Sequence, residues 1–235
     1  KVKKKLLTIL LAAAVAAALY GCSSDDGADG QTQAATQAET QSAASEETES
    51  ETEEETEAAY EQGTVSDTGY QSAWLNIQFT ASADDVMATQ EEIDSLLESG
   101  SEVIEENTGV DTSASATTTV TEMMVSRVDG VPSIQLMVEQ LPMANMTEDQ
   151  YLTSVQAQLE AVDMGYAFDD SFGTRQIAGQ DYKVLSAEAT YNGVDMIQEY
   201  AVRKQGDRMV AFVMTCTPDT QEDAENLYGQ FTAIQ

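Results

Sequence analysis

The chain of 235 residues contains 42 acidic and 10 basic residues and no histidine, which gives a formal net charge of −32 at pH 7. Such a surface repels the phosphates of nucleic acids and of anionic lipids, because binding to phosphate needs Lys and Arg, and no nucleic-acid partner is expected. The absence of histidine from the sequence excludes Ser-His-Asp and Cys-His catalysis and a histidine-bound zinc site.

Residues 1–21 have the three parts of a secretory signal peptide. Four lysines precede an apolar stretch from Leu6 to Tyr20, and the small residue Gly21 stands directly before Cys22. The apolar stretch is shorter than the ~20 residues that span a bilayer. We therefore expect a cleaved signal peptide rather than a permanent transmembrane helix.

The last four residues of this segment, Leu19-Tyr20-Gly21-Cys22, resemble the lipobox of bacterial lipoproteins, which usually has Ala or Ser where Tyr20 stands. The resemblance implies that the peptide is cut before Cys22 and that this cysteine carries diacylglycerol. Each buried lipid methylene contributes ~0.8 kcal/mol, so two or more chains would hold the protein on a membrane. The expected location is the outer face of the cell membrane, reached through the lipid on Cys22.

Residues 22–66 contain the lipidated cysteine and an acidic stretch of Glu, Thr, Ser, Gln and Ala with almost no large apolar residue. Such a composition cannot bury enough surface to offset the loss of chain entropy, which predicts a disordered linker. Repulsion within the segment 46–57 would extend it. An acidic binding tract is the alternative interpretation.

Residues 67–235 have the length of one globular domain. Its first predicted strand covers 73–81, where apolar and polar residues alternate. The first helix is predicted over 88–107, and Thr89 with Glu92 forms a capping box at its start.

A hairpin follows, with strands over 117–128 and 132–141 and a tight two-residue turn at Asp129-Gly130. The second helix is predicted over 147–165, with a capping box at its start. That capping box pairs Thr147 with Gln150, and Gly165 is the expected C-terminal stop.

The C-terminal part of the chain predicts an antiparallel meander and a closing helix. Four strands are expected, over 172–177, 181–191, 194–204 and 208–216. The helix begins after Thr217-Pro218, which combine an N-cap with proline at the first helical position. One face of this helix is expected to bury Ala224, Leu227, Tyr228 and Phe231.

The order of predicted elements is strand, helix, two strands, helix, four strands, helix, which favours the α+β class with a mostly antiparallel sheet of about seven strands covered by helices. The opening strand is similar to that of the small PsbP-like (Mog-like) α/β/α sandwich domains, in Tyr70, Trp74, Leu75, Ile77 and Phe79. The meander resembles the same group in Gly179, Tyr182, Gln198, Tyr200, Arg203, Lys204 and Gly206. The resemblance covers residues 70–235 and implies a PsbP-like sandwich, but no shared catalytic centre.

Two places in the domain are candidate ligand sites. Asp169 and Asp170 lie in a predicted loop, where they could bind a cation or a polar ligand; a solvated loop is the alternative. Trp74 is the only tryptophan and could stack on a sugar, with packing between layers as the alternative. Cys216 lies in an apolar run and is expected to be a small buried residue, with Cys22 as the only other cysteine.

No cofactor and no metal site are expected, because the sequence has no GxSxG, Walker-A, dinucleotide-binding or EF-hand motif. The leading hypothesis is a non-catalytic, surface-anchored lipoprotein that binds or assists an envelope protein or glycan. The second is a carboxylate-dependent hydrolase of wall or extracellular glycans, for which Asp169-Asp170 would be the acids. A solute-binding receptor is a third, disfavoured because the domain shows no two-lobe duplication.

Overall fold

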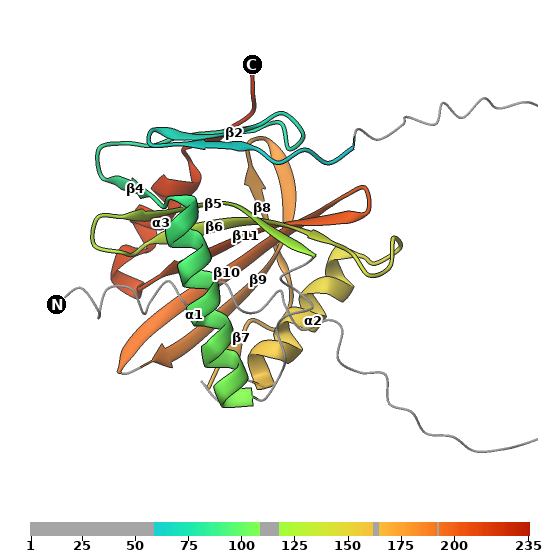
Figure 1. The fold of residues 1–235 in the computed structure, drawn as a ribbon. Helices are drawn as coiled ribbons and strands as arrows, with labels where there is room; N and C mark the ends of the chain where they lie inside the picture. The colour runs from blue at the N-terminus through green and yellow to red at the C-terminus, as the bar shows by residue number, and fades with distance from the viewer. Residues whose placement is uncertain (1–58, 109–117, 162–164, 192) are drawn as a thin grey trace, which may run out of the picture.

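The computed structural model describes residues 59–108, 118–161, 165–191 and 193–235 (Figure 1). The predicted signal peptide, Cys22 and most of the predicted linker lie outside these residues. The described part is an α+β fold with two antiparallel sheets and three α-helices.

The larger sheet contains eight of the described strands. These are β4 (Asp85–Met87), β5 (Thr119–Arg127), β6 (Ser133–Gln140), β7 (Ala167–Phe168), β8 (Gly173–Ile177), β9 (Gln180–Tyr191), β10 (Val194–Gln205) and β11 (Arg208–Cys216). Their spatial order is β4-β5-β6-β11-β10-β9-β7, and β8 pairs with another part of β9. The predicted meander is confirmed, because β8 to β11 pair in sequence.

The smaller sheet contains four strands in the order β1-β2-β3-β12 and lies at the top of Figure 1. They are β1 (Thr64–Ser66), β2 (Gly69–Ser72), β3 (Ile77–Thr80) and β12 (Phe231–Thr232). The strand predicted over 73–81 therefore begins only at Ile77. Asn76 before it has a positive φ of 54° and donates its N–H to the carbonyl of Ala73, which makes a turn there.

The N-terminal and C-terminal ends of the domain differ from the predicted elements. Thr64–Ser66 form β1, although the linker was expected to continue to residue 66. Phe231 is buried as expected, but it lies in β12, opposite Phe79 of β3, and not on the closing helix. The small sheet thus joins the two ends of the domain.

Three α-helices accompany the sheets: α1 (Gln90–Thr108), α2 (Glu148–Ala161) and α3 (Gln221–Tyr228), the last preceded by a 3₁₀ turn over Pro218–Thr220. α1 and α2 pack on one face of the large sheet, whereas α3 and the small sheet pack on the other. The expected cover of helices is thus present on one face, and a second sheet replaces part of it on the other. None of the described helices has the length and apolarity needed to cross a bilayer.

The predicted capping boxes begin two of these helices. Before α1, the Thr89 N–H donates to the Glu92 carboxylate at 2.9 Å and the Glu92 N–H donates to Thr89 Oγ1 at 3.3 Å. Thr147 and Gln150 repeat the arrangement before α2, at 3.0 and 3.3 Å. These bonds satisfy helix N–H groups that have no partner within the helix.

The loop between β5 and β6 is longer than predicted. Instead of a two-residue turn at Asp129-Gly130, the strands are joined by Val128–Pro132, and the Arg127 N–H donates to the Pro132 carbonyl at 3.0 Å. Gly130 has a φ of +94°, a conformation that favours glycine, so this residue does supply the sharp bend.

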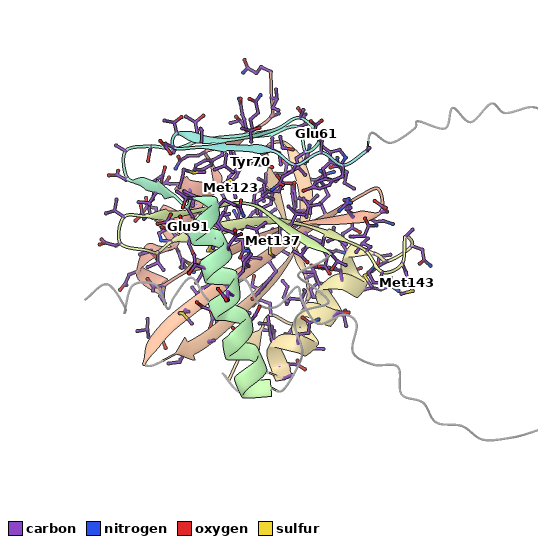
Figure 2. The ribbon with its side chains drawn as sticks, in the orientation of Figure 1. Glu61, Tyr70, Glu91, Met123, Met137 and Met143 are labelled. Atoms are coloured by element: carbon purple, nitrogen blue, oxygen red, sulfur yellow. The ribbon has the colours of Figure 1, made fainter. Side chains whose placement is uncertain are left out.

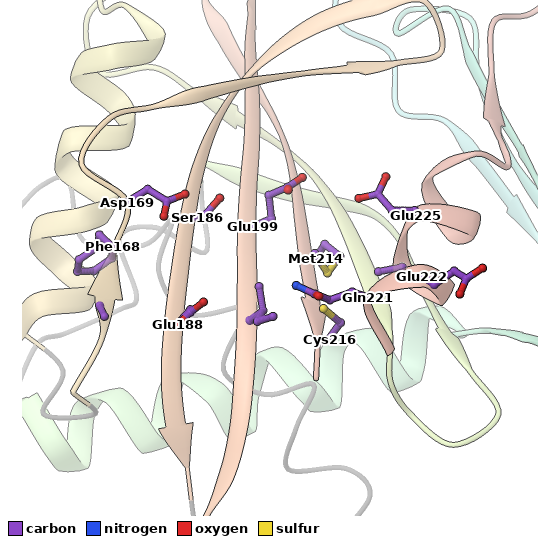
Figure 3. Close-up of a pocket in the computed structure, with 13 residues that line it drawn as sticks. Phe168, Asp169, Ser186, Glu188, Glu199, Met214, Cys216, Gln221, Glu222 and Glu225 are labelled. Atoms are coloured by element: carbon purple, nitrogen blue, oxygen red, sulfur yellow. The ribbon is translucent and has the colours of Figure 1, made fainter. Parts of the chain in front are cut away.

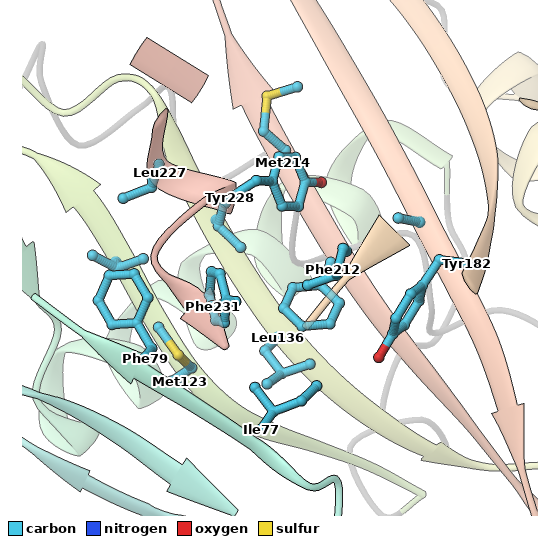
Figure 4. Packing of buried hydrophobic residues seen from close by; sticks show 14 of the residues in the cluster. Ile77, Phe79, Met123, Leu136, Tyr182, Phe212, Met214, Leu227, Tyr228 and Phe231 are labelled. Carbon is cyan, nitrogen blue, oxygen red and sulfur yellow. The ribbon is translucent and has the colours of Figure 1, made fainter. Parts of the chain in front are cut away.

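Side chains of the two sheets interdigitate to form the main core, in which Tyr70 of β2 and Met123 of β5 lie while Met137 of β6 points to the opposite face (Figure 2). Phe212 of β11 lies in this core and makes edge-on contacts with two rings, those of Tyr182 at 5.4 Å and Phe231 at 5.0 Å between centroids (Figure 4). Such aromatic contacts add stability beyond the area that they bury.

Candidate functional site

A groove of about 570 Å³ lies over β9, β10 and β11, between β7 on one side and α3 on the other (Figure 3). Alternate residues of a strand point to the same face, and two residues from each of the three strands form the floor. They are Ser186 and Glu188 of β9, Ile197 and Glu199 of β10, and Met214 and Cys216 of β11. Ala167, Phe168 and Asp169 line one wall, and Gln221, Glu222, Ala224 and Glu225 line the other.

Five carboxylates line the groove: Asp169, Glu188, Glu199, Glu222 and Glu225. They come from β9, β10, α3 and the residue after β7, so segments distant in sequence contribute the same charge. Within the described residues, no three acidic or cysteine side chains lie close enough together to hold a metal ion. The groove is thus an acidic surface whose floor combines Ile197, Met214 and Cys216 with Ser186, Glu188 and Glu199.

Arg175 of β8 binds two of these carboxylates. Its Nε donates to Glu199 Oε1 at 2.5 Å, and its Nη1 and Nη2 donate to Glu225 at 2.7 Å each. The guanidinium also lies 4.3 Å from the centre of the Tyr228 ring. The hydrogen bonds from Arg175 hold the pKa of Glu225 below its usual range, so Glu225 stays ionised near neutral pH.

Cys216 lies on the floor of the groove and is buried, as predicted, with 1% of its surface exposed. Burial, together with the charges of Glu199 and Glu225, raises the pKa of its thiol to about 11. The thiol is therefore protonated at neutral pH. Since the thiolate is the nucleophile in cysteine chemistry, Cys216 is an inert part of the floor.

The structure separates the residues predicted as ligand sites. Asp169 lines the groove, whereas Asp170 is exposed and is not part of its lining. Trp74 lies on a different cavity of about 500 Å³, with Tyr60, Gln205 and Arg208. Trp74 is half-buried, and its side chain packs against the main core.

Most acidic residues of the groove were not singled out from the sequence. Glu188, Glu199 and Glu225 belong to no sequence motif. In a chain with 42 acidic residues, their positions do not distinguish them from the other acidic residues. The strand period places Ile197 and Glu199 on one face, but only the pairing of β9, β10 and β11 brings them beside Asp169 and α3.

Two further glutamates are buried on strands outside the groove. Glu139 of β6 is 2% exposed and accepts a hydrogen bond from the Tyr151 hydroxyl of α2 at 2.6 Å. Desolvation raises the pKa of Glu139 to about 7. Glu122 of β5 is 1% exposed and accepts hydrogen bonds from the segment before β2.

No protein-family model matches the sequence, and no curated protein matches it either. Solved structures show a distant similarity. The solution structure of cyanobacterial PsbP (CyanoP) from Synechocystis sp. PCC 6803 has 10% identity, covers 75% of this chain and 99% of its own, and gives a TM-score of 0.42. It is a PsbP, the group that the sequence resembles.

The crystal structure of LpqN, involved in cell envelope biogenesis of Mycobacterium tuberculosis, has 12% identity and a TM-score of 0.39. It covers 68% of this chain and 83% of its own. Similarities of this size carry no information about the activity of the present chain. The α+β class rests on the strands and helices described above.

Proposed function

We propose that the protein is a lipid-anchored, non-catalytic binding protein of the bacterial envelope, and that the groove over β9, β10 and β11 binds a cationic segment of a partner. The signal-peptide pattern, Cys22 and the acidic stretch that follows support the anchor and the linker. The observation that carries the binding role is a groove lined by five carboxylates together with the apolar side chains of Phe168, Ile197 and Met214.

The charges of the groove favour binding over proton transfer. A glycosidase needs one carboxylic acid whose pKa is raised, so that it can donate a proton to the leaving group. Arg175 has the opposite effect on Glu225, whose pKa it lowers. The Cys216 thiol, with its raised pKa, is no nucleophile.

The groove already holds one cationic side chain of the protein itself. Arg175 places its guanidinium between Glu199 and Glu225, with a ring face beneath it. Among the described residues, no basic side chain is paired with the other three carboxylates of the groove, Asp169, Glu188 and Glu222. Lysine or arginine side chains of a partner would neutralise these three, while their methylene stems pack on Phe168, Ile197 and Met214.

Titration with spermine and with a lysine-rich peptide, followed by NMR, tests this site. We expect the signals of the groove residues to shift first, and we expect the double variant D169K/E188K to weaken binding at least tenfold. The matched control is the double variant E98K/E160K, which reverses two exposed charges on α1 and α2, outside the groove. Shifts spread evenly over the surface, or an equal loss of affinity in E98K/E160K, would show that net charge alone attracts the ligand.

The anchor is tested separately by the variant C22S, expressed from the full chain in a bacterial host. The parent protein is expected in the membrane fraction and in the detergent phase, with a mass increase that corresponds to diacylglycerol. C22S should lose all three properties, because the thioether on Cys22 carries the acyl chains. An unmodified mass of the parent protein would refute the proposed lipid anchor. It would not contradict the proposed binding role of the groove.

A further inference from the structure

The carboxylate of Glu122 receives its hydrogen bonds from one short part of the chain. The Tyr60 hydroxyl donates to Oε1 at 2.5 Å, while the Gly63 N–H and the Tyr70 hydroxyl donate to Oε2 at 2.8 and 2.7 Å. Only 1% of Glu122 is exposed. A buried carboxylate is costly unless it is hydrogen-bonded, so these three donors stabilise it in its position.

A bulge in β5 aims Glu122 at this segment. Thr121 pairs with Met137 of β6 and Met123 pairs with Leu136, so Glu122 is the extra residue of the bulged strand. Met123 already points into the core between the sheets. In a regular strand, Glu122 would point to the face opposite that of Met123. The bulge allows Glu122 to reach Tyr70 on the same face as Met123.

The ring of Tyr60 is held on two further sides. Trp74 contacts it edge-on at 5.1 Å between centroids, and the Arg208 guanidinium lies 4.2 Å from its centre. Burial, more than the neighbouring Glu122, raises the pKa of the Tyr60 hydroxyl above its ordinary value. The hydroxyl therefore remains a hydrogen-bond donor at every physiological pH.

The rest of the segment has little that attaches it to the domain. Glu61, Gln62 and the whole of β1 are exposed, and β1 pairs with β2 alone. Gly63 lies so close to Tyr70 that a Cβ atom there would be 2.4 Å from its ring. The attachment of Tyr60–Gly63 thus depends on Glu122 and on the contacts of one ring.

We propose that Tyr60–Gly63 form a clasp, held closed by Glu122, that opens as a unit and gates the cavity beside Trp74. Tyr60 is one wall of that cavity of about 500 Å³, and Gln205 at the end of β10 and Arg208 at the start of β11 line another side. Opening the clasp removes this wall and exposes Trp74.

Hydrogen exchange measured by mass spectrometry tests the clasp in the full chain. The variant E122Q keeps the shape of the side chain but replaces one acceptor oxygen by an NH2 group, so either the Tyr60 hydroxyl or both Gly63 N–H and the Tyr70 hydroxyl lose their acceptor. We expect the amides of residues 60–66 to exchange at least tenfold faster, and those of α2 to be unchanged. Y60F removes a single hydrogen bond and keeps the ring, so it should give about a tenfold increase in the same amides.

The matched control is E139Q, because Glu139 is the second buried glutamate among the residues whose burial the structure describes, and it bonds to α2 instead. E139Q should leave residues 60–66 unchanged. Fluorescence of Trp74, the only tryptophan, gives an independent measurement, and acrylamide should quench it more strongly in E122Q and Y60F. Unchanged exchange at 60–66 in Y60F, or equally faster exchange in all elements of E122Q, would refute the clasp.

Discussion

At the scale of single residues, Glu139 shows how burial changes the chemistry of a carboxyl group. Its position on β6 places it under α2, where Tyr151 is its hydrogen-bond partner. The Tyr151 hydroxyl lowers the pKa of Glu139, but desolvation raises it more, to about 7. Near neutral pH, a part of the molecules therefore carries a proton on this group.

This pKa predicts how stability depends on pH. The folded protein binds the proton of Glu139 more tightly than the unfolded chain does, whose carboxyl has an ordinary pKa near 4.5. Its contribution to stability is thus fully present below that value and is lost as the pH rises through about 7. We expect the free energy of unfolding in urea to fall between pH 5 and pH 8 by up to roughly 3 kcal/mol.

The variant E139Q is the control for this effect. Glutamine can accept the Tyr151 hydroxyl but does not titrate, so the fall between pH 5 and pH 8 should nearly disappear. Glu92 and Glu225, whose pKa values are lowered, change charge below this range and do not contribute within it. An equal pH dependence in E139Q would show that other groups cause it.

At the scale of elements, Arg175 connects β8 with β10 and α3 through Glu199 and Glu225. Replacing it by glutamine leaves two carboxylates on the groove without their cation. We expect R175Q to lower the free energy of unfolding by roughly 1–3 kcal/mol, as for the loss of hydrogen bonds to charged groups. If hydrogen exchange in R175Q, relative to the parent protein, increases more in α3 than in α2, the loss of stability arises around Arg175.

A second ion pair provides the comparison for R175Q. Lys183 of β9 and Asp149 of α2 lie 2.5 Å apart, but their side chains are 37% and 57% exposed. Exposed pairs contribute little, so K183Q should change the free energy of unfolding by less than about 1 kcal/mol. If both variants lose the same stability, the geometry around Arg175 has no special effect.

The elements differ in how far the sequence predicts them. The helix starts at Thr89 and Thr147 are correct because a capping box is a local signal, contained within four residues. β1 and β12 were missed because they are short and exist only through pairing with distant strands. The same reason hides the groove and the clasp, since the bulge at Glu122 depends on the register of β5 against β6.

At the scale of the whole molecule, the acidic excess acts on stability through repulsion. A net charge of −32 opposes compaction, because like charges repel one another. Salt screens this repulsion, with a Debye length of about 30 Å at 0.01 M and about 10 Å at 0.1 M. We therefore expect the Tm to rise between 10 and 200 mM NaCl at pH 7, and scanning calorimetry can measure it.

Two effects must be separated in that experiment. Screening also weakens the ion pairs of Arg175 and Lys183, which would lower the Tm. Potassium chloride should reproduce the rise, because screening does not depend on the identity of the monovalent cation. A Tm that falls with either salt would mean that the few ion pairs outweigh the general repulsion.

The small sheet has a consequence for the order in which the protein is made and folded. Gln78 of β3 contacts Thr232 of β12, 154 positions further along the chain. During synthesis, almost the whole polypeptide must be made before β12 is available to pair with β3. Contacts between such distant positions slow folding, so the edge of β3 stays open for pairing with other chains until the last strand closes it.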